Sequence, residues 1–258
     1  RVSDGQGADA RFQQQATRFF AHTLLAASLA TLTALTPAQP TTSAAPHTTP
    51  TVHNTMAQRM QACVMCHGQQ GRATNTGYFP RIAGKPEGYL FHQLQNFRDG
   101  RRRNRAMSHL TQHLSDDYLR DIARYFAGLD LPYPPAQAHG LSPQQQRTAE
   151  QLVFQGAPER DIPACTACHG RSMAGRLPAM PGLLTLPADY LIGQLGAWRT
   201  GLRAATAPDC MADIAKRLTP EEISVVARWL SAQSLPTGTT PEAASTQPLP
   251  VDCGGGHR

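Results

Sequence analysis

A short pattern of two cysteines and a histidine, Cys-x-x-Cys-His-Gly, occurs twice in this chain and constrains its fold more than any other feature. Residues 62–68 read Ala-Cys-Val-Met-Cys-His-Gly, and residues 164–170 read Ala-Cys-Thr-Ala-Cys-His-Gly. The similarity continues downstream, where the aligned residues are Tyr89, Gln93, Leu94, Phe97, Arg98 and Gly100 in the first copy and Tyr190, Gln194, Leu195, Trp198, Arg199 and Gly201 in the second. Such a repeat predicts two homologous domains, over 53–130 and 140–235, joined by a proline-rich linker at 131–139.

Both repeats show helical periodicity without long period-two alternation, which predicts an all-α fold. In each repeat one helix should carry the cysteines, and a second should span about 87–99 or 188–200. A third helix should begin after Ser115 in the first repeat and after Thr219 in the second. Ser or Thr followed by acidic residues or proline is typical of a helix start. The sequence therefore predicts three helices and long loops in each domain.

The Cys-x-x-Cys-His pattern indicates covalent attachment of a c-type haem. Cysteines three positions apart lie on one side of a helical turn, so both can form thioethers with one porphyrin while the next histidine binds the iron. We therefore expect two haem c groups, one held by Cys63, Cys66 and His67 and the other by Cys165, Cys168 and His169. A thioredoxin-like dithiol would need a preceding strand, which neither repeat shows. A four-cysteine zinc site would leave the two histidines without a role.

Each repeat also contains a methionine that could bind the other face of the iron. Met107 follows the first motif and Met211 the second, and each precedes the third predicted helix by a similar distance. Their matched placement favours axial ligation, which raises the reduction potential relative to a bis-histidine haem. Ordinary core packing is the alternative for a methionine. Bis-histidine ligation through His109 or His113 is a weaker alternative, because the second repeat has no counterpart for them.

A proline follows each histidine at a similar distance, Pro80 after His67 and Pro181 after His169. A carbonyl oxygen at such a turn can accept a hydrogen bond from the histidine Nδ1–H, which orients the ring and makes it a stronger ligand. We therefore predict that these two prolines support the iron-binding histidines, with an ordinary loop proline as the alternative.

The beginning of the chain resembles an export signal. Arg11 and Arg18 precede a mostly apolar run at 19–35, and small residues follow it. This order is typical of a secretory signal peptide, so residues 1–45 are predicted to be a signal and leader that direct the protein to the periplasm. An uncleaved membrane anchor is the alternative, and it leaves membrane association open. The Gly- and Pro-containing residues 236–258 are predicted to be a flexible tail.

Taken together, these motifs resemble the class I cytochromes c, and specifically the two-haem cytochrome c4 family. The resemblance covers about 53–235 and rests on both Cys-x-x-Cys-His-Gly motifs, the matched prolines and methionines, and the repeated downstream segments. It implies two tandem cytochrome c domains with their haems near the domain interface. It also implies a periplasmic electron carrier rather than an enzyme, placed between a quinol-oxidising complex or dehydrogenase and a terminal cytochrome c oxidase. The alternatives are the cytochrome subunit of a periplasmic dehydrogenase, and a peroxidase-like enzyme with an open iron site.

The chain departs from the family pattern beside one presumed ligand. Cys210 directly precedes Met211, and Cys253 is the other cysteine outside the two motifs. We hypothesise that Cys210 and Cys253 form a disulfide that ties the tail to the methionine loop. Two free thiols, or Cys210 as an iron ligand, are the alternatives.

The charge of the chain is mild and uneven. The formal net charge is +6 and charged residues make up 16% of the chain, which argues against a disordered or nucleic-acid-coating protein. The arginine run at 101–105 could form a basic rim beside the first haem that pairs with its propionates or docks an acidic partner, or it could simply be a solvated loop. It lacks an aromatic platform, so nucleic-acid binding is not expected. Since the first repeat has the larger basic excess, an anionic redox partner should meet that domain.

Overall fold

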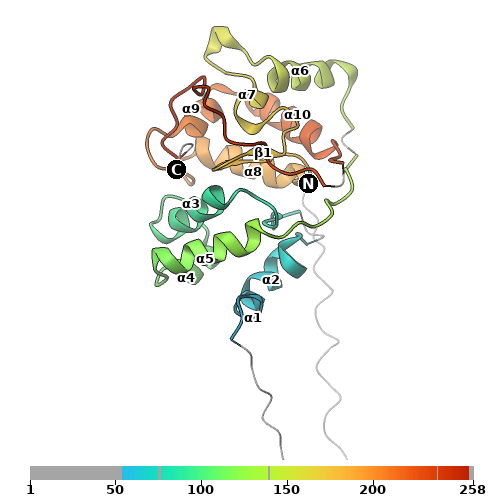
Figure 1. Cartoon of the computed structure of the whole chain (residues 1–258). Helices are drawn as coiled ribbons and strands as arrows, with labels where there is room; N and C mark the ends of the chain where they lie inside the picture. The colour runs from blue at the N-terminus through green and yellow to red at the C-terminus, as the bar shows by residue number, and fades with distance from the viewer. Residues whose placement is uncertain (1–53, 75–76, 139, 237, 256–258) are drawn as a thin grey trace, which may run out of the picture. The chain divides into compact units, whose positions relative to one another are not determined.

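The two halves of the repeat fold into two helical layers that pack against each other (Figure 1). The structure is a computed structural model and describes residues 54–74, 77–138, 140–236 and 238–255. In the first half the elements are α1 (Met56–Arg59), α2 (Gln61–His67), the 3₁₀ turn η1 (Gln69–Gly71), α3 (Glu87–Arg98), α4 (Arg105–Thr111) and α5 (Asp116–Ala127). In the second they are α6 (Pro143–Phe154), η2 (Pro158–Arg160), α7 (Cys165–His169), β1 (Gly175–Arg176), β2 (Met180–Pro181), α8 (Ala188–Arg199), α9 (Cys210–Arg217) and α10 (Pro220–Ser231).

The all-α prediction is confirmed, and the predicted starts of the third helices are confirmed too. Ser115 caps α5 by accepting the backbone N–H of Tyr118. Thr219 and Glu222 form a capping box at the start of α10, where the side chain of each residue accepts the backbone N–H of the other. These caps satisfy donors that the first turn of a helix would otherwise leave unpaired.

The structure contains more helices than the three predicted in each half. The loops expected around the methionines are partly helical, as α4 and α9. Asn104 and Asp209 cap these helices, because their side-chain oxygens accept the N–H groups of Met107 and Ala212 at 3.1 Å. The second half also gains α6, which begins at Pro143 with a capping box formed by Ser142 and Gln145. These capping residues lie in polar loops, and hydrophobic periodicity alone does not predict the helices that begin at them.

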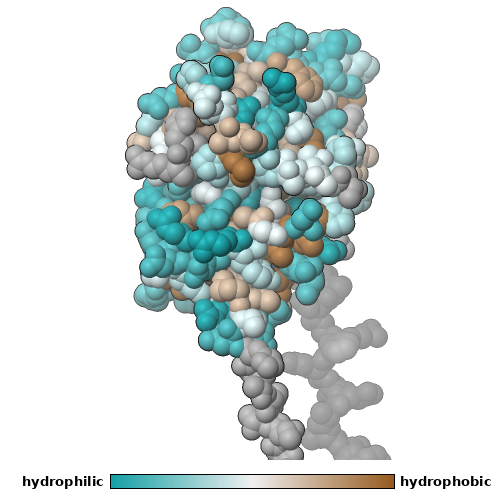
Figure 2. All heavy atoms as spheres, viewed as in Figure 1, coloured by the Kyte–Doolittle hydropathy of each residue, from teal (hydrophilic) through white to brown (hydrophobic). Residues whose placement is uncertain are grey.

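Each half has its own apolar core. In the first, α3 packs on α5 around Leu90, Leu119 and Phe126. In the second, α10 packs on both α6 and α8, and its buried members include Val226 and Leu230. On the face drawn in Figure 2 hydrophilic residues prevail and hydrophobic ones form small groups.

The segments outside the repeats are held to the fold. The linker is held by Arg81 of the first half. Its guanidinium donates to the carbonyl oxygens of the linker residues Leu131 and Pro132, at 2.7 and 3.0 Å. The segment predicted to be a flexible tail runs along the second half over its described residues 238–255. Its Glu242 pairs with the backbone of β1 and forms an ion pair of 3.3 Å with Arg176. Backbone pairing and this partly exposed ion pair hold the tail against the second half, although its sequence looks like a linker.

The predicted signal and leader, residues 1–45, lie outside the described residues. Within the described ranges, none of the helices has the length and apolar character needed to cross a bilayer.

Candidate haem sites

The two cysteine motifs have nearly the same local structure. α2 ends at His67 and α7 ends at His169, and each histidine is followed by a glycine. Gly68 and Gly170 have φ values of 75° and 86°, which L side chains rarely adopt. A Cβ atom at Gly68 would lie 2.1 Å from the carbonyl oxygen of Ala73. The glycine that follows each motif therefore allows the chain to turn sharply away from the attachment helix.

Both predicted histidine–proline contacts are present in the structure. The Nδ1 atom of His67 lies 2.9 Å from the carbonyl oxygen of Pro80, and Nδ1 of His169 lies 2.8 Å from that of Pro181. A carbonyl oxygen only accepts, so each Nδ1 carries the proton and each Nε2 keeps the lone pair that a metal needs. Burial lowers the pKa of both imidazoles, which favours the same neutral form.

Three of the four motif cysteines are poorly suited to thiolate chemistry. Burial raises the pKa of Cys63 and Cys168, and it raises the pKa of Cys165 to about 11. A redox-active dithiol or a zinc ligand instead depends on an accessible thiolate. Across the described ranges, no three His, Cys, Asp or Glu side chains converge as metal ligands, so the two pairs do not form one zinc site.

A cavity of about 870 Å³ extends through both halves and is lined by both motifs. Its walls include all four motif cysteines, both motif histidines, and apolar side chains such as Leu90 and Leu230. Large, mostly apolar cavities with a few placed polar groups are typical of cofactor sites. The donor set and this apolar space fit a haem in each half.

Met107 and Met211 both line this cavity, and each is held by a capped helix. Met60 and Met180 line it too, although Met60 lies on the attachment side, with its Sδ 4.0 Å from Cys63 Sγ. The histidines considered as alternatives, His109 and His113, are exposed and are not among the lining residues. The Nδ1 atom of His109 instead lies 3.2 Å from the side-chain nitrogen of Gln112, the residue that follows its own helix.

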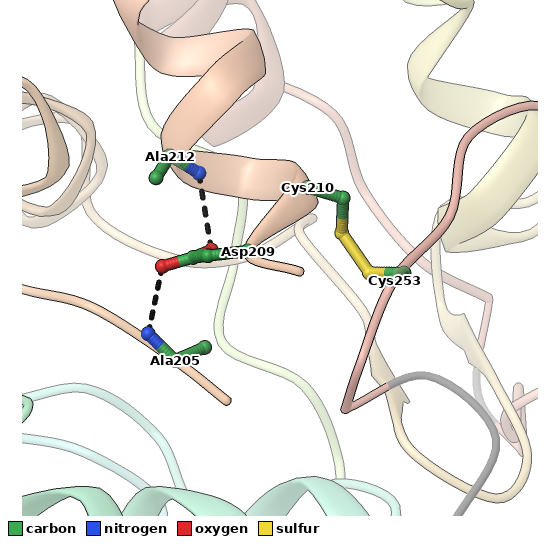
Figure 3. The surroundings of a disulfide bond; sticks show 5 residues. All are labelled: Ala205, Asp209, Cys210, Ala212 and Cys253. Carbon is green, nitrogen blue, oxygen red and sulfur yellow. Dashed lines mark hydrogen bonds between the residues drawn. A yellow bond between two sulfur atoms is a disulfide. The ribbon is translucent and has the colours of Figure 1, made fainter. Parts of the chain in front are cut away.

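Cys210 and Cys253 are joined by a disulfide in the structure (Figure 3). Figure 3 also shows Asp209, whose two carboxylate oxygens accept the N–H groups of Ala205 and Ala212, so the start of α9 is fixed from both sides. Beyond the disulfide, the N–H of Gly254 donates to the carbonyl of Pro208 at 2.8 Å. The tail thus closes over the helix start that carries Met211.

Several buried polar residues that the sequence pattern does not single out lie at the junction of the halves. Arg102 and Arg203 are buried and reach side chains of the opposite half. Lys85 is buried as well, and its Nζ donates to the carbonyl oxygen of Gly182 at 2.8 Å, while burial lowers its pKa to about 7. A signal was available, because Gln93 recurs as Gln194 and both arginines follow a repeated Arg-x-Gly segment. Arg102 lies inside the arginine run at 101–105, for which the sequence predicts either a basic rim beside the first haem or a solvated loop.

Comparison with known proteins agrees with this arrangement. Residues 52–126 match the family described as "Cytochrome C oxidase, cbb3-type, subunit III". The chain is 35% identical over 181 residues to a protein of Thiomonas intermedia (strain K12) named "Thiosulfate dehydrogenase electron acceptor", covering 67% of this chain and 79% of that one. It is 34% identical over 174 residues to a "Cytochrome c4" of Thiocapsa roseopersicina, covering 67% and 87%.

Among solved structures, the reduced recombinant cytochrome c4 from Pseudomonas stutzeri is similar to this one. Its TM-score is 0.59 and its sequence is 29% identical, over 68% of this chain and 95% of that chain. The similarity therefore spans nearly the whole of that protein and includes both halves of this one.

Proposed function

Because this chain belongs to the dihaem cytochrome c4 family, we propose that it carries single electrons in the periplasm from a respiratory donor to a terminal cytochrome c oxidase. It binds two haem c groups covalently and is an electron-transfer protein rather than an enzyme. The haem iron supplies the one-electron chemistry, and the protein sets its potential through ligands, burial and hydrogen bonds.

The observation that carries the proposal is the duplicated site itself. Each half contributes two such groups to the lining of the same cavity. One is an imidazole whose Nδ1 contacts a proline carbonyl, and the other is a methionine on a capped helix. We propose that the iron of the first haem is bound by His67 and Met107, and that of the second by His169 and Met211. The proposed domains are residues 53–130 and 140–235, and residues 1–45 form the proposed export signal and leader.

The ligand proposal is tested on the purified holoprotein. The mass should exceed that of the chain by two haems, and the oxidised protein should show the near-infrared charge-transfer band of methionine-bound iron at both sites. Replacing either methionine by alanine should remove half of this band. A full band after Met211→Ala would show that another group binds the second iron.

A second candidate differs in the electron donor. Two relatives named "Thiosulfate dehydrogenase electron acceptor" are 35% and 36% identical to this chain, slightly more than the relatives named cytochrome c4. This supports a periplasmic dehydrogenase as the donor, with this chain as its partner or cytochrome subunit. Stopped-flow reduction by a thiosulfate dehydrogenase and by a quinol-oxidising complex, compared at equal concentrations, distinguishes the two donors.

A further inference from the structure

The C-terminal tail is fixed to the second half at two points, one on each side of the proposed haem site. The carboxylate of Glu242 accepts the backbone N–H of Arg171, in the loop that follows the motif histidine. Further along, the disulfide joins Cys253 to Cys210, which directly precedes Met211 (Figure 3). The segment between these two anchors therefore crosses the second half from the histidine side of the site to the methionine side.

The end of the tail also forms part of the cavity wall. Val251, Cys253 and Gly255 line the cavity that contains both motif histidines. Gly254 packs closely on the loop before α9, because a Cβ atom there would lie 2.3 Å from the carbonyl oxygen of Ala207. The tail follows the second repeat, whereas the first repeat is followed by the short linker at 131–139. The repeat therefore gives the first half no copy of this cover.

Positions that correspond in the two repeats differ in exposure. Leu110, three residues after Met107, is 48% exposed. Ile214, three residues after Met211, is partly buried and packs on the second core. The second cysteine of the motif is exposed in the first half and only partly exposed in the second. The first site is therefore open to partners, and the second is covered.

The rims of the two sites also differ in charge. Arg59 and Arg103 are exposed and line the cavity in the first half, and no ion pair joins either one to an Asp or Glu in the part of the chain that the structure describes. In the second half Asp209 lines the cavity, and Asp252 is exposed beside Cys253. An acidic protein surface is therefore attracted to the first rim and not to the second.

The first rim also presents apolar groups that suit a protein partner. Tyr78 is 65% exposed and lines the cavity, as does Leu110. The hydroxyl oxygen of Tyr78 accepts the side-chain N–H of Asn104, the cap of α4, at 3.2 Å, so the ring is held beside the helix that carries Met107. Aromatic side chains and arginine are the residues most enriched at protein interfaces.

We propose that the tail, residues 238–255, closes the second site to redox partners, and that acidic redox proteins therefore dock at the mouth of the first half. This mouth is the surface formed by Arg59, Tyr78, Arg103 and Leu110. The inference rests on the proposed function, because it takes each half as a haem site. In each encounter with a donor, the donor is oxidised by one electron and this protein is reduced by one at its first site. The second site exchanges electrons only through the first.

The cover is tested by NMR on the reduced holoprotein, with the neutral nitroxide TEMPOL as a paramagnetic probe of surface access. Low-spin ferrous haem is diamagnetic, so broadening of side-chain methyl signals comes from the probe. We expect strong broadening at Leu110 and little at Ile214. A variant that ends at Leu235 should show strong broadening at both, and Thr246→Ala, which keeps the tail, should behave as the wild type.

Equal broadening at Leu110 and Ile214 in the wild type would overturn the cover, and this spectrum decides the matter alone if the truncated variant fails to bind haem. If the truncated variant binds haem and Ile214 stays protected, the tail is not the cover, and the proposal is overturned.

The docking surface is tested with an anion and with a protein donor. Hexacyanochromate(III), a redox-inert paramagnetic anion, should broaden the Leu110 signals less in Arg103→Glu than in the wild type. Arg147→Glu is the matched control, since Arg147 is exposed on α6 and is not among the cavity-lining residues. In stopped flow at low salt, Arg103→Glu should slow reduction by a thiosulfate dehydrogenase about threefold or more, and the control should slow it less. High salt should remove the difference.

The outcomes separate this proposal from the proposed function. If the donor reduces the wild type, Arg103→Glu and Arg147→Glu equally fast at low salt, the docking surface is refuted while the proposed function stands. If neither the thiosulfate dehydrogenase nor a quinol-oxidising complex reduces the wild type, the proposed function fails. The two NMR measurements then still decide whether the second site is covered and whether the first rim attracts an anion.

Discussion

The Cys210–Cys253 disulfide should stabilise the second half substantially, and Cys253→Ser is the change that tests this. The bond joins positions 43 residues apart, with Cα atoms at a separation of 5.0 Å that suits a disulfide. The chain between them contains all of α9 and α10. α10 forms much of the second core, and α9 carries Met211, so the closed loop contains both a packing element and a proposed iron ligand.

The size of the effect follows from the entropy of the unfolded chain. Closing a loop of this length removes about 4 kcal/mol of conformational freedom from the denatured state at 25 °C. Measured disulfides often contribute somewhat less, so a loss of about 2–4 kcal/mol in the free energy of unfolding is expected. The contacts of Glu242 with β1 stay intact in the variant, and they act in the folded state only. They therefore do not replace the lost constraint on the unfolded chain.

The assay is urea unfolding of the holoprotein, followed by far-ultraviolet circular dichroism. Cys210→Ser, Cys253→Ser and the double variant should lose the same stability, because each breaks the same bond. Thr246→Ala, an exposed change in the same tail, should unfold like the wild type. Dithiothreitol should destabilise the wild type and leave the variants unchanged. If Cys253→Ser unfolds at the wild-type urea concentration, the loop-closure reasoning is refuted.

Three further outcomes follow from individual side chains. Phe126→Ala should lower the free energy of unfolding of the first half by about 3–5 kcal/mol, because the ring is 2% exposed, and a urea titration measures this. Met107→Ala should lower the first haem's potential while the second haem keeps its methionine band, which spectroelectrochemistry detects. The hydrogen-bonded ion pair with Arg160 lowers the pKa of Glu222, so its stabilising effect is present at neutral pH and lost as the pH falls through that lowered pKa. The urea midpoint of Glu222→Gln should therefore fall less on acidification than that of the wild type, and equal acid dependence would contradict the assignment.

The sequence allowed the fold class and the attachment helices to be predicted because they depend on short-range patterns. Ser115 and Thr219 signal helix starts through side chains that bond a backbone group three residues away. The spacing within each cysteine motif likewise involves one helical turn. The additional helices α4 and α9 were missed, since each is short and begins at a single capping side chain, Asn104 or Asp209, within a polar loop.

Contacts between distant segments were harder to predict. Pro80 and Pro181 could be proposed because they occur twice, and repetition distinguishes a functional position from an ordinary loop proline. Glu242 occurs once, in a stretch whose composition suits a flexible linker. Its placement depends on the backbone of β1 and on Arg176, far away in the sequence. Composition describes local flexibility, and it does not show which distant strand edge a segment can join.

The buried pair Arg102 and Arg203 shows why repetition must be considered across the halves as well as within them. Within one half, Arg102 and Gln93 form an ordinary hydrogen bond, and the second half repeats it with Arg203 and Gln194. Only when the halves pack does each arginine also reach the other glutamine, and only then do two like charges share one buried place. The repeats also differ beneath these arginines, because Arg102 lies over Phe97 in the first half and Arg203 lies over Trp198 in the second, so one repeated pattern gives the two arginines different aromatic partners.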